Sequence, residues 1–317
     1  MQTPVRIVVL GTGGTIAGLA ATADDDAAYR SAQVGVAALL AGLDLPNDVE
    51  VESESVAQID SKDMDFAAWR ALALAVVRHL ARPDVTGVVV AHGTDTLEET
   101  AYFLERVVGA DKPVVLTGAM RPASARHADG PGNLADAIVV AAAGEPVGVR
   151  VVFAGQIHSP RDVRKAHPRR LDAFTSGEAG PLGHVALRQI KILRVPRDAP
   201  MAIGVAVLPE DPRAWPWVDI VASAAGVDGR AVAALVDAGV DGIVVAATGN
   251  GTVHHLLEAA LDRAAARGIV VVRSSRCLDG PIVDAEMQRL PSASDLTPVK
   301  ARVELILGLL ARRPTSG

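Results

Sequence analysis

The sequence has almost no cysteine: Cys277 is the only one among 317 residues. An intramolecular disulfide is therefore excluded, and so is a zinc site built from several thiolates. We expect Cys277 to be a small buried residue, because the sequence offers it no recognisable base partner. No His-Glu-x-x-His pattern occurs, so the histidines predict no metal site.

Long apolar runs and an excess of basic charge are also missing. No stretch approaches the roughly 18 apolar residues of a membrane span, and Met1–Arg6 lacks the charged and apolar regions of a signal peptide. The 31 basic residues are outnumbered by 37 acidic ones, which gives a net charge of −6 and argues against nucleic acid as a partner. The sequence therefore predicts a cytoplasmic protein that binds neither membranes nor nucleic acids.

What the chain does contain is a regular alternation of apolar runs and helix-like segments. Gly87–Ala91 and Pro113–Thr117 are strand-like and almost free of polar residues, which is typical of parallel strands covered on both faces. Because 317 residues exceed the usual single core, two domains are expected. We predict an α/β fold with a larger N-terminal catalytic domain on a mainly parallel sheet (residues 1–189) and a smaller C-terminal α/β domain (residues 214–317).

Prolines separate the two predicted domains. Between Ile190 and Trp217 they occur at Pro196, Pro200, Pro209, Pro212 and Pro216. We therefore place a linker at residues 190–213. Within it, the composition of Ala202–Leu208 still leaves one strand open as an alternative to an irregular linker.

The first apolar run, Val5–Leu10, ends in a glycine-rich stretch, Gly11–Gly14, that is followed by Thr15. One interpretation is a nucleotide-binding loop, but the dinucleotide pattern requires Gly or Ala where Ile16 stands, and a P-loop requires a lysine that is absent here. A plain strand-to-loop turn is the second interpretation. The third is a nucleophilic threonine, because open α/β sheets bind ligands at the carboxyl ends of their strands.

Polar side chains follow other predicted strands as well. Thr94 and Asp95 come after Gly87–Ala91, and Ser61 stands just before a predicted helix. Taken singly, Ser61 is more simply a helix cap, as is Asp95, and Lys165 is more simply a solvated lysine in a polar loop. Capping does not explain why several hydroxyls and a carboxylate gather at neighbouring strand ends.

Several longer segments resemble one known family. They are Gly13–Gly18, His92–Leu104, Pro113–Pro122, Asp129–Leu134, Asp237–Val244 and Val272–Arg276. Collinear from the first strand to the last helix, they resemble the bacterial-type L-asparaginase/glutaminase family. The resemblance implies hydrolysis of a side-chain amide through a threonine acyl-enzyme, without metal or organic cofactor. It also implies a homotetramer built of intimate dimers.

Carried over by position, the resemblance makes Thr15 the nucleophile on a mobile lid, assisted by Tyr29. Thr94, Asp95 and Lys165 correspond to a second cluster that moves protons. A threonine hydroxyl needs a base, which a lysine held by an aspartate can supply. The backbone N–H of Thr94 is a further expected donor, to the developing oxyanion. The sequence leaves open which threonine attacks first.

For substrate binding, the resemblance implies that Asp95 holds the α-ammonium group and that Ser61 donates to the α-carboxylate. Asn250 and Glu286 match positions that complete the site from a neighbouring subunit, so a monomer would lack part of it. Lys62 stands where many relatives carry glutamine. It is expected either to grip the substrate carboxylate or to obstruct the pocket.

The resulting hypothesis is an L-asparagine amidohydrolase that produces L-aspartate and ammonia. A glutaminase-asparaginase remains open, because one methylene gives only about 1–3 kcal/mol of discrimination. The amidase subunit of a transfer-RNA-dependent amidotransferase would carry an added N-terminal domain, for which Met1–Pro4 leaves no room. An inactive amino-acid sensor is a further alternative, although it would need no nucleophile. The lid, residues 20–31, is rich in Ala and Asp and departs from the family pattern.

Overall fold

The computed structural model describes residues 5–20, 29–145, 147–196, 201–283 and 290–313. The chain divides into two compact units, Met1–Val205 and Ala206–Gly317, each with its own sheet. This division falls inside the segment 190–213, whose first residues still belong to strand β12 (Gln189–Ile192) of the first unit. The predicted α/β fold, with a larger N-terminal and a smaller C-terminal unit, is confirmed.

The first unit is built on an eight-stranded sheet with the order β12-β11-β8-β7-β6-β5-β1-β4. Five neighbouring strands are parallel: β1 (Val5–Gly13), β4 (Val49–Ile59), β5 (Gly87–Ala91), β6 (Pro113–Thr117) and β7 (Gly148–Phe153). Antiparallel pairing adds β8 (Gln156–His158), β11 (Gly183–Ala186) and β12. Because β1 lies between β4 and β5, the strand order reverses there, and such a reversal is where open α/β sheets bind ligands.

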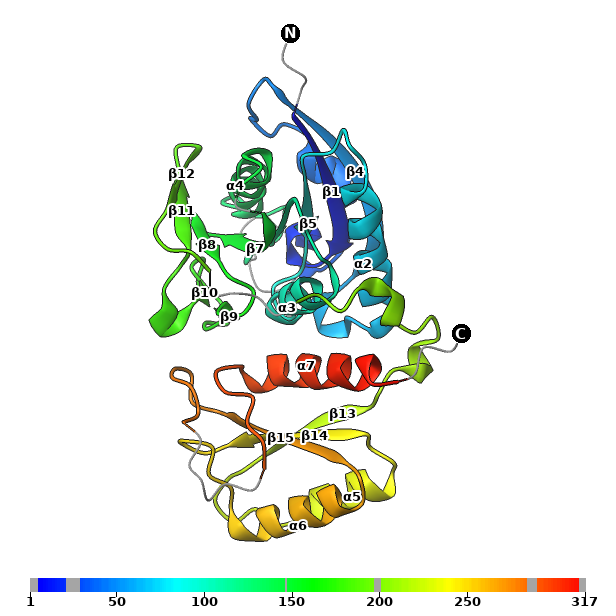
Figure 1. Ribbon diagram of the computed structural model, residues 1–317. Helices are drawn as coiled ribbons and strands as arrows, with labels where there is room; N and C mark the ends of the chain where they lie inside the picture. Colours follow the sequence, from blue (N-terminus) through cyan, green and yellow to red (C-terminus); the bar gives the residue numbers. More distant parts are fainter. Residues whose placement is uncertain (1–4, 21–28, 146, 197–200, 284–289, 314–317) are drawn as a thin grey trace. The chain divides into compact units, whose positions relative to one another are not determined.

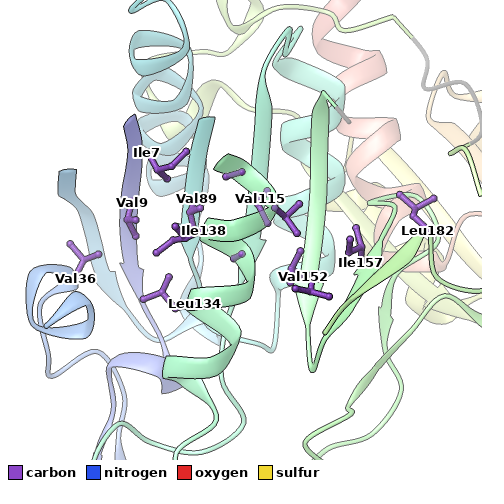
Figure 2. Close-up of a cluster of buried hydrophobic side chains, with 14 residues drawn as sticks. Ile7, Val9, Val36, Val89, Val115, Leu134, Ile138, Val152, Ile157 and Leu182 are labelled. Carbon is purple, nitrogen blue, oxygen red and sulfur yellow. The ribbon is translucent and has the colours of Figure 1, made fainter. Parts of the chain in front are cut away.

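Helices cover both faces of this sheet (Figure 1). The helices of the first unit are α1 (Val36–Leu40), α2 (Phe66–Leu80), α3 (Leu97–Val107) and α4 (Gly130–Ala142). Side chains alternate along a strand, so Val9, Val89 and Val115 share one face, against which Leu134 and Ile138 of α4 pack (Figure 2). All five are fully or almost fully buried, and each such burial is worth about 1.5–3 kcal/mol.

Two short hairpins complete the first unit. The strands β2 (Leu19–Ala20) and β3 (Tyr29–Arg30) pair with each other, as do β9 (Arg164–Lys165) and β10 (Phe174–Thr175). On the helical side, α2 and α3 pack together through Trp69 and Phe103, whose rings stack with centroids 4.7 Å apart.

The second unit is a smaller parallel sheet with helices on both faces. Its strands are β13 (Val218–Ala222), β14 (Gly242–Ala247) and β15 (Val270–Ser275), and its helices are α5 (Arg230–Asp237), α6 (His255–Ala266) and α7 (Pro298–Ala311). The helices α5 and α6 pack on one face and α7 on the other (Figure 1). Gly242 faces α7, because a Cβ there would lie 2.9 Å from Leu305 Cδ2.

Strand β4 has no counterpart among the predicted strands. It forms one edge of the large sheet, and none of its residues is fully buried. Glu50, Glu52 and Glu54 recur at every second position and form ion pairs with arginines (Arg6, Arg78 and Arg82). An edge strand so rich in paired charges lacks the apolar run by which its parallel neighbours are recognised.

At two other places the structure decides against an interpretation that the sequence offered. Ala202–Leu208 is not a strand, because Gly204 has a φ of +81° and Val205–Val207 form a 3₁₀ turn. Cys277 is exposed rather than buried, since it lies in the turn after β15, where its N–H donates to Ser275 Oγ. Among the described helices, none has both the length and the apolar character needed to cross a membrane.

Candidate active site

Thr15 begins a 3₁₀ turn, η1 (Thr15–Ala17), directly after two glycines with positive φ, +100° at Gly13 and +82° at Gly14. The Gly14 N–H donates to Ile59 O of β4 at 2.9 Å. A Cβ on Gly14 would overlap Gly93 Cα, so only glycine permits this approach. The turn that carries Thr15 is thereby held against the segment that follows β5.

The second predicted cluster lies on that segment. Lys165 Nζ is 2.9 Å from Thr94 Oγ1 and 2.6 Å from Asp95 Oδ1, so its ammonium bridges the hydroxyl and the carboxylate. Thr94 is buried, Lys165 has 15% of its side chain exposed, and Asp95 has 54% exposed. The structure therefore brings these three predicted residues together. The cluster is buried at Thr94 and exposed to solvent at Asp95.

The β9–β10 hairpin sets the position of Lys165. Lys165 pairs with Phe174, and Ala166 N–H donates to Ala173 O at 2.7 Å. Phe174 is buried against Phe153, with ring centroids 4.7 Å apart. The hairpin that carries Lys165 thus packs against the end of β7. This places Lys165 beside Thr94 and Asp95, which follow β5 and are remote from it in sequence.

Ser61 also joins this cluster. It begins the 3₁₀ turn η2 (Ser61–Asp63), is 3% exposed, and accepts a hydrogen bond from Asp95 N–H at 3.1 Å. Its carbonyl accepts from Thr96 Oγ1 at 2.7 Å. Neither the Ser61 hydroxyl nor the Thr96 hydroxyl caps a helix. The helix α2 is capped instead by the carboxylate of Asp65, which accepts a hydrogen bond from a backbone N–H in its first turn. The simpler capping interpretation of Ser61 was therefore wrong.

Residues that the sequence analysis did not single out support the cluster from behind. Asn133, in the first turn of α4, donates to Gly118 O at 2.9 Å and accepts from Ala154 N–H at 3.0 Å. Gly118 in turn packs against the residues at the end of β5. A Cβ on Gly118 would lie 2.5 Å from His92 O and 3.3 Å from Thr94 Cγ2. Asn133 stands in one of the family-like segments, which was the available signal for it.

His92 is fully buried at the end of β5, and its Nδ1 lies 2.6 Å from Gly93 O. Burial lowers the pKa of His92 to about 4, against the opposing effect of the hydrogen bond with that carbonyl. The imidazole is therefore neutral at pH 7.

Lys62 points elsewhere. Its ammonium lies 2.9 Å from Asp60 and 3.0 Å from Asp63, and 61% of its side chain is exposed. The hydrogen bond with Asp60, followed by that with Asp63, raises the pKa of Lys62. Both partners belong to the same exposed turn, so the structure does not bring this charge into the Thr94–Lys165 cluster.

The structure gives no contact between the cluster and the remaining predicted residues that can be described. Asn250 belongs to the second unit, where its amide makes two hydrogen bonds with the backbone of Val283, at 2.8 and 2.7 Å. Glu286 lies outside the described residues, as does most of the lid; of Tyr29 only the backbone, in β3, is described. In the described part of the chain, no three His, Cys, Asp or Glu residues are grouped to hold a metal ion.

This geometry can be set beside known proteins. The model of the family described as "Asparaginase, N-terminal" matches residues 6–197, and that of the "Glutaminase/Asparaginase C-terminal domain" matches residues 217–315. A glutaminase-asparaginase of Pseudomonas fluorescens biotype A is 37% identical, with 96% of this chain and 86% of that protein covered. A probable periplasmic L-asparaginase of Haemophilus influenzae is also 37% identical, with 96% and 88% covered.

A solved structure agrees with these matches. The probable cytoplasmic L-asparaginase of Campylobacter jejuni is similar with a TM-score of 0.88 and 36% identity, covering 96% of this chain and 95% of that one. The two family models together cover nearly the whole chain, as the relatives do, and the hydroxyls, the lysine and the aspartate stand in the matched N-terminal part. The protein therefore belongs to the asparaginase family.

Proposed function

We propose that this protein is an L-asparagine amidohydrolase that releases L-aspartate and ammonia. The single observation that carries the proposal is the Lys165 ammonium, held between Thr94 Oγ1 and Asp95 and in contact with the segment against which the Thr15 turn packs. Relatives named L-asparaginase support the choice of substrate.

In this mechanism the Thr15 hydroxyl attacks the side-chain carbonyl carbon of asparagine. A carbon–oxygen bond forms, the carbon–nitrogen bond breaks, and the amide nitrogen leaves as ammonia with the proton taken from the hydroxyl. Water then cleaves the ester, which releases aspartate and restores Thr15. Thr94 and Lys165 move the protons, and the Thr94 N–H stabilises the oxyanion. These steps require no metal or organic cofactor.

The substrate's charged groups have matching partners. The half-exposed Asp95 carboxylate is suited to the α-ammonium group. Ser61 Oγ already accepts a hydrogen bond from Asp95 N–H, so its own hydrogen is available to the α-carboxylate. We place Asn250 and Glu286 at the site of a neighbouring subunit within a homotetramer, with Tyr29 assisting Thr15; this follows the family resemblance.

A second candidate is a glutaminase-asparaginase of broader specificity. It is favoured by the Pseudomonas fluorescens relative, whose name carries both activities. We place the protein in the cytoplasm, in line with the Campylobacter jejuni relative, which is named a probable cytoplasmic L-asparaginase; the Haemophilus influenzae relative is named periplasmic.

Ammonia release from L-asparagine, L-glutamine and D-asparagine tests the function directly. We expect L-asparagine to be the best substrate and Thr15→Ala to lose at least about a thousandfold in kcat, because the acyl-enzyme cannot form. The matched control is Thr12→Ala, which removes another buried hydroxyl from the same segment, one that donates to Ala91 O. It should keep kcat within about threefold.

Three outcomes would contradict the proposal. Near-normal turnover by Thr15→Ala would remove that residue as nucleophile. Equal losses in the two variants would show that the segment is merely fragile. Tight binding of asparagine by the wild type without ammonia release would instead indicate a sensor.

A further inference from the structure

The Gly93–Thr94 peptide is the part of the site on which the proposed oxyanion contact depends. A peptide bond is planar and trans, so the Gly93 carbonyl and the Thr94 N–H point in opposite directions. Whatever fixes the carbonyl therefore fixes the direction of the N–H. Thr94 is 3% exposed, and no residue in the described ranges accepts a hydrogen bond from its N–H. That donor remains available to a ligand.

The group that holds the carbonyl is the His92 side chain, 2.6 Å away through Nδ1. A carbonyl oxygen can only accept, so Nδ1 carries the hydrogen. The ring is neutral at pH 7 because burial lowers the pKa of His92 to about 4, and its single ring proton is therefore the one on Nδ1. The other nitrogen, Nε2, is buried and has no partner among the described residues. The histidine thus makes one directed contact at the cost of an unsatisfied acceptor.

Neighbouring groups confine Gly93 and the peptide before it as well. A Cβ on Gly93 would lie 2.5 Å from Ser61 Oγ, and a Cβ on Gly14 would overlap Gly93 Cα. The carbonyl of His92 meets Gly118 equally closely. Close packing limits the position of the peptide, whereas the imidazole is the one group among the described residues that supplies a directed hydrogen bond to its carbonyl.

We propose that His92 is a positioning residue: by donating from Nδ1 to the Gly93 carbonyl, it aims the Thr94 N–H at the oxyanion of the tetrahedral intermediate. The inference rests on the proposed threonine acyl-enzyme mechanism. The N–H meets a full negative charge only in the intermediate. If the N–H is misdirected, kcat therefore falls, whereas binding of the substrate in its ground state is almost unchanged.

Two variants of equal shape test this. His92→Asn places an amide N–H near the former Nδ1, whereas His92→Leu has the same branching without a donor. We expect His92→Leu to lower kcat about 10- to 100-fold with KM and the inhibition constant of L-aspartate changed less than about threefold. His92→Asn should recover kcat to within about fivefold of the wild type. Equal losses in both variants, or a rise in KM with unchanged kcat, would overturn the proposal.

A measurement on the wild type keeps the two proposals separate. Nitrogen-15 NMR of histidine-labelled protein distinguishes the Nδ1–H from the Nε2–H tautomer, and we expect His92 to be Nδ1–H at pH 7. An enzyme that hydrolyses asparagine with His92 in the Nε2–H form would overturn the positioning role alone. Absence of asparagine turnover in the wild type would overturn the proposed function instead.

Discussion

Among single residues, Lys165 has the most consequential position. Its ammonium lies within hydrogen-bond distance of one hydroxyl and one carboxylate, in a partly buried setting where salt screens charges less than at the surface. Asp95 is the more exposed partner, with 54% of its side chain exposed, and the lysine contact is to its Oδ1, so the proposed contact with a substrate ammonium group falls to Oδ2. A single carboxylate can thereby hold the lysine and bind an ammonium group at the same time.

Lys62 gives a prediction of the opposite kind. We expect Lys62→Gln to change kcat, KM and the ratio of asparagine to glutamine turnover by less than about twofold, because its ammonium is paired with Asp60 and Asp63 on an exposed turn. Steady-state kinetics with both substrates measures this. Lys165→Met is the contrasting variant and should lose nearly all turnover while remaining folded. A tenfold change in KM for Lys62→Gln would show that this side chain does reach the substrate.

At this scale the sequence predicts residue identity better than side-chain direction. Thr94, Asp95 and Lys165 come together as the family-like motifs imply. The direction of Lys62 could not be predicted, because it depends on two carboxylates competing for one flexible ammonium. Cys277 was assigned to the interior on residue type alone, whereas its place in a turn decides its exposure.

Among the elements, the glycine turn between β1 and η1 determines whether the site assembles. Two successive residues with positive φ turn the chain sharply after β1 and bring Gly14 against Gly93. The same turn accepts from the Ala32 N–H through Gly14 O at 3.0 Å. One turn therefore joins the strand, the segment after β5 and the chain that leads on from β3.

Gly14→Ala tests that contact, and Gly42→Ala is its matched control. Both glycines have a φ near +80°, but a Cβ on Gly42 meets nothing within 4 Å. We expect Gly42→Ala to lose about 1–2 kcal/mol of stability from backbone strain, and Gly14→Ala to lose more because its Cβ also overlaps Gly93; denaturant unfolding measures both losses. Only Gly14→Ala should also lower kcat, by at least about tenfold, because it displaces Gly93. Equal kcat values in the two variants would show that the Gly14–Gly93 contact is dispensable.

Strands that are buried on both faces could be predicted from the sequence, whereas exposed or very short strands could not. Strands β5 and β6 coincide with their predicted ranges, since a strand covered on both faces is apolar at nearly every position. Strand β4 alternates glutamate with small or apolar residues at a sheet edge, so its sequence lacks that run. The two-residue pairing of β9 with β10, which positions Lys165, is too short for any periodicity to indicate.

At the scale of the whole molecule, the predicted residues are divided between two units. The proposed nucleophile, the proposed proton-moving cluster and Ser61 belong to the first, whereas Asn250 and Glu286 belong to the second. In the proposed assembly each active site takes its second set from another subunit. Catalysis then requires association of the chains as well as folding of each one.

Mixing two inactive proteins tests this arrangement. Thr15→Ala and Glu286→Ala should each be nearly inactive, but mixed dimers contain one site in which both residues are intact. For random assembly from equal amounts, about a quarter of all sites should be complete, and turnover should recover accordingly after joint refolding. Size-exclusion chromatography confirms that mixed oligomers form. Mixed oligomers without recovered activity would place both residues in the site of one chain.

The charged edge strand described above has a consequence for how the protein behaves when crowded. Among the described strands, β4 pairs with β1 alone, and an outermost strand of this length presents a row of backbone donors and acceptors onto which another sheet can add. If the β4 strand of a second copy paired there in antiparallel register, glutamates of one copy would lie opposite glutamates of the other. If this pairing broke the ion pairs with the arginines, the repulsion between the glutamates would be uncompensated. The glutamates that make this strand hard to predict from the sequence thus also disfavour aggregation by edge-to-edge strand pairing.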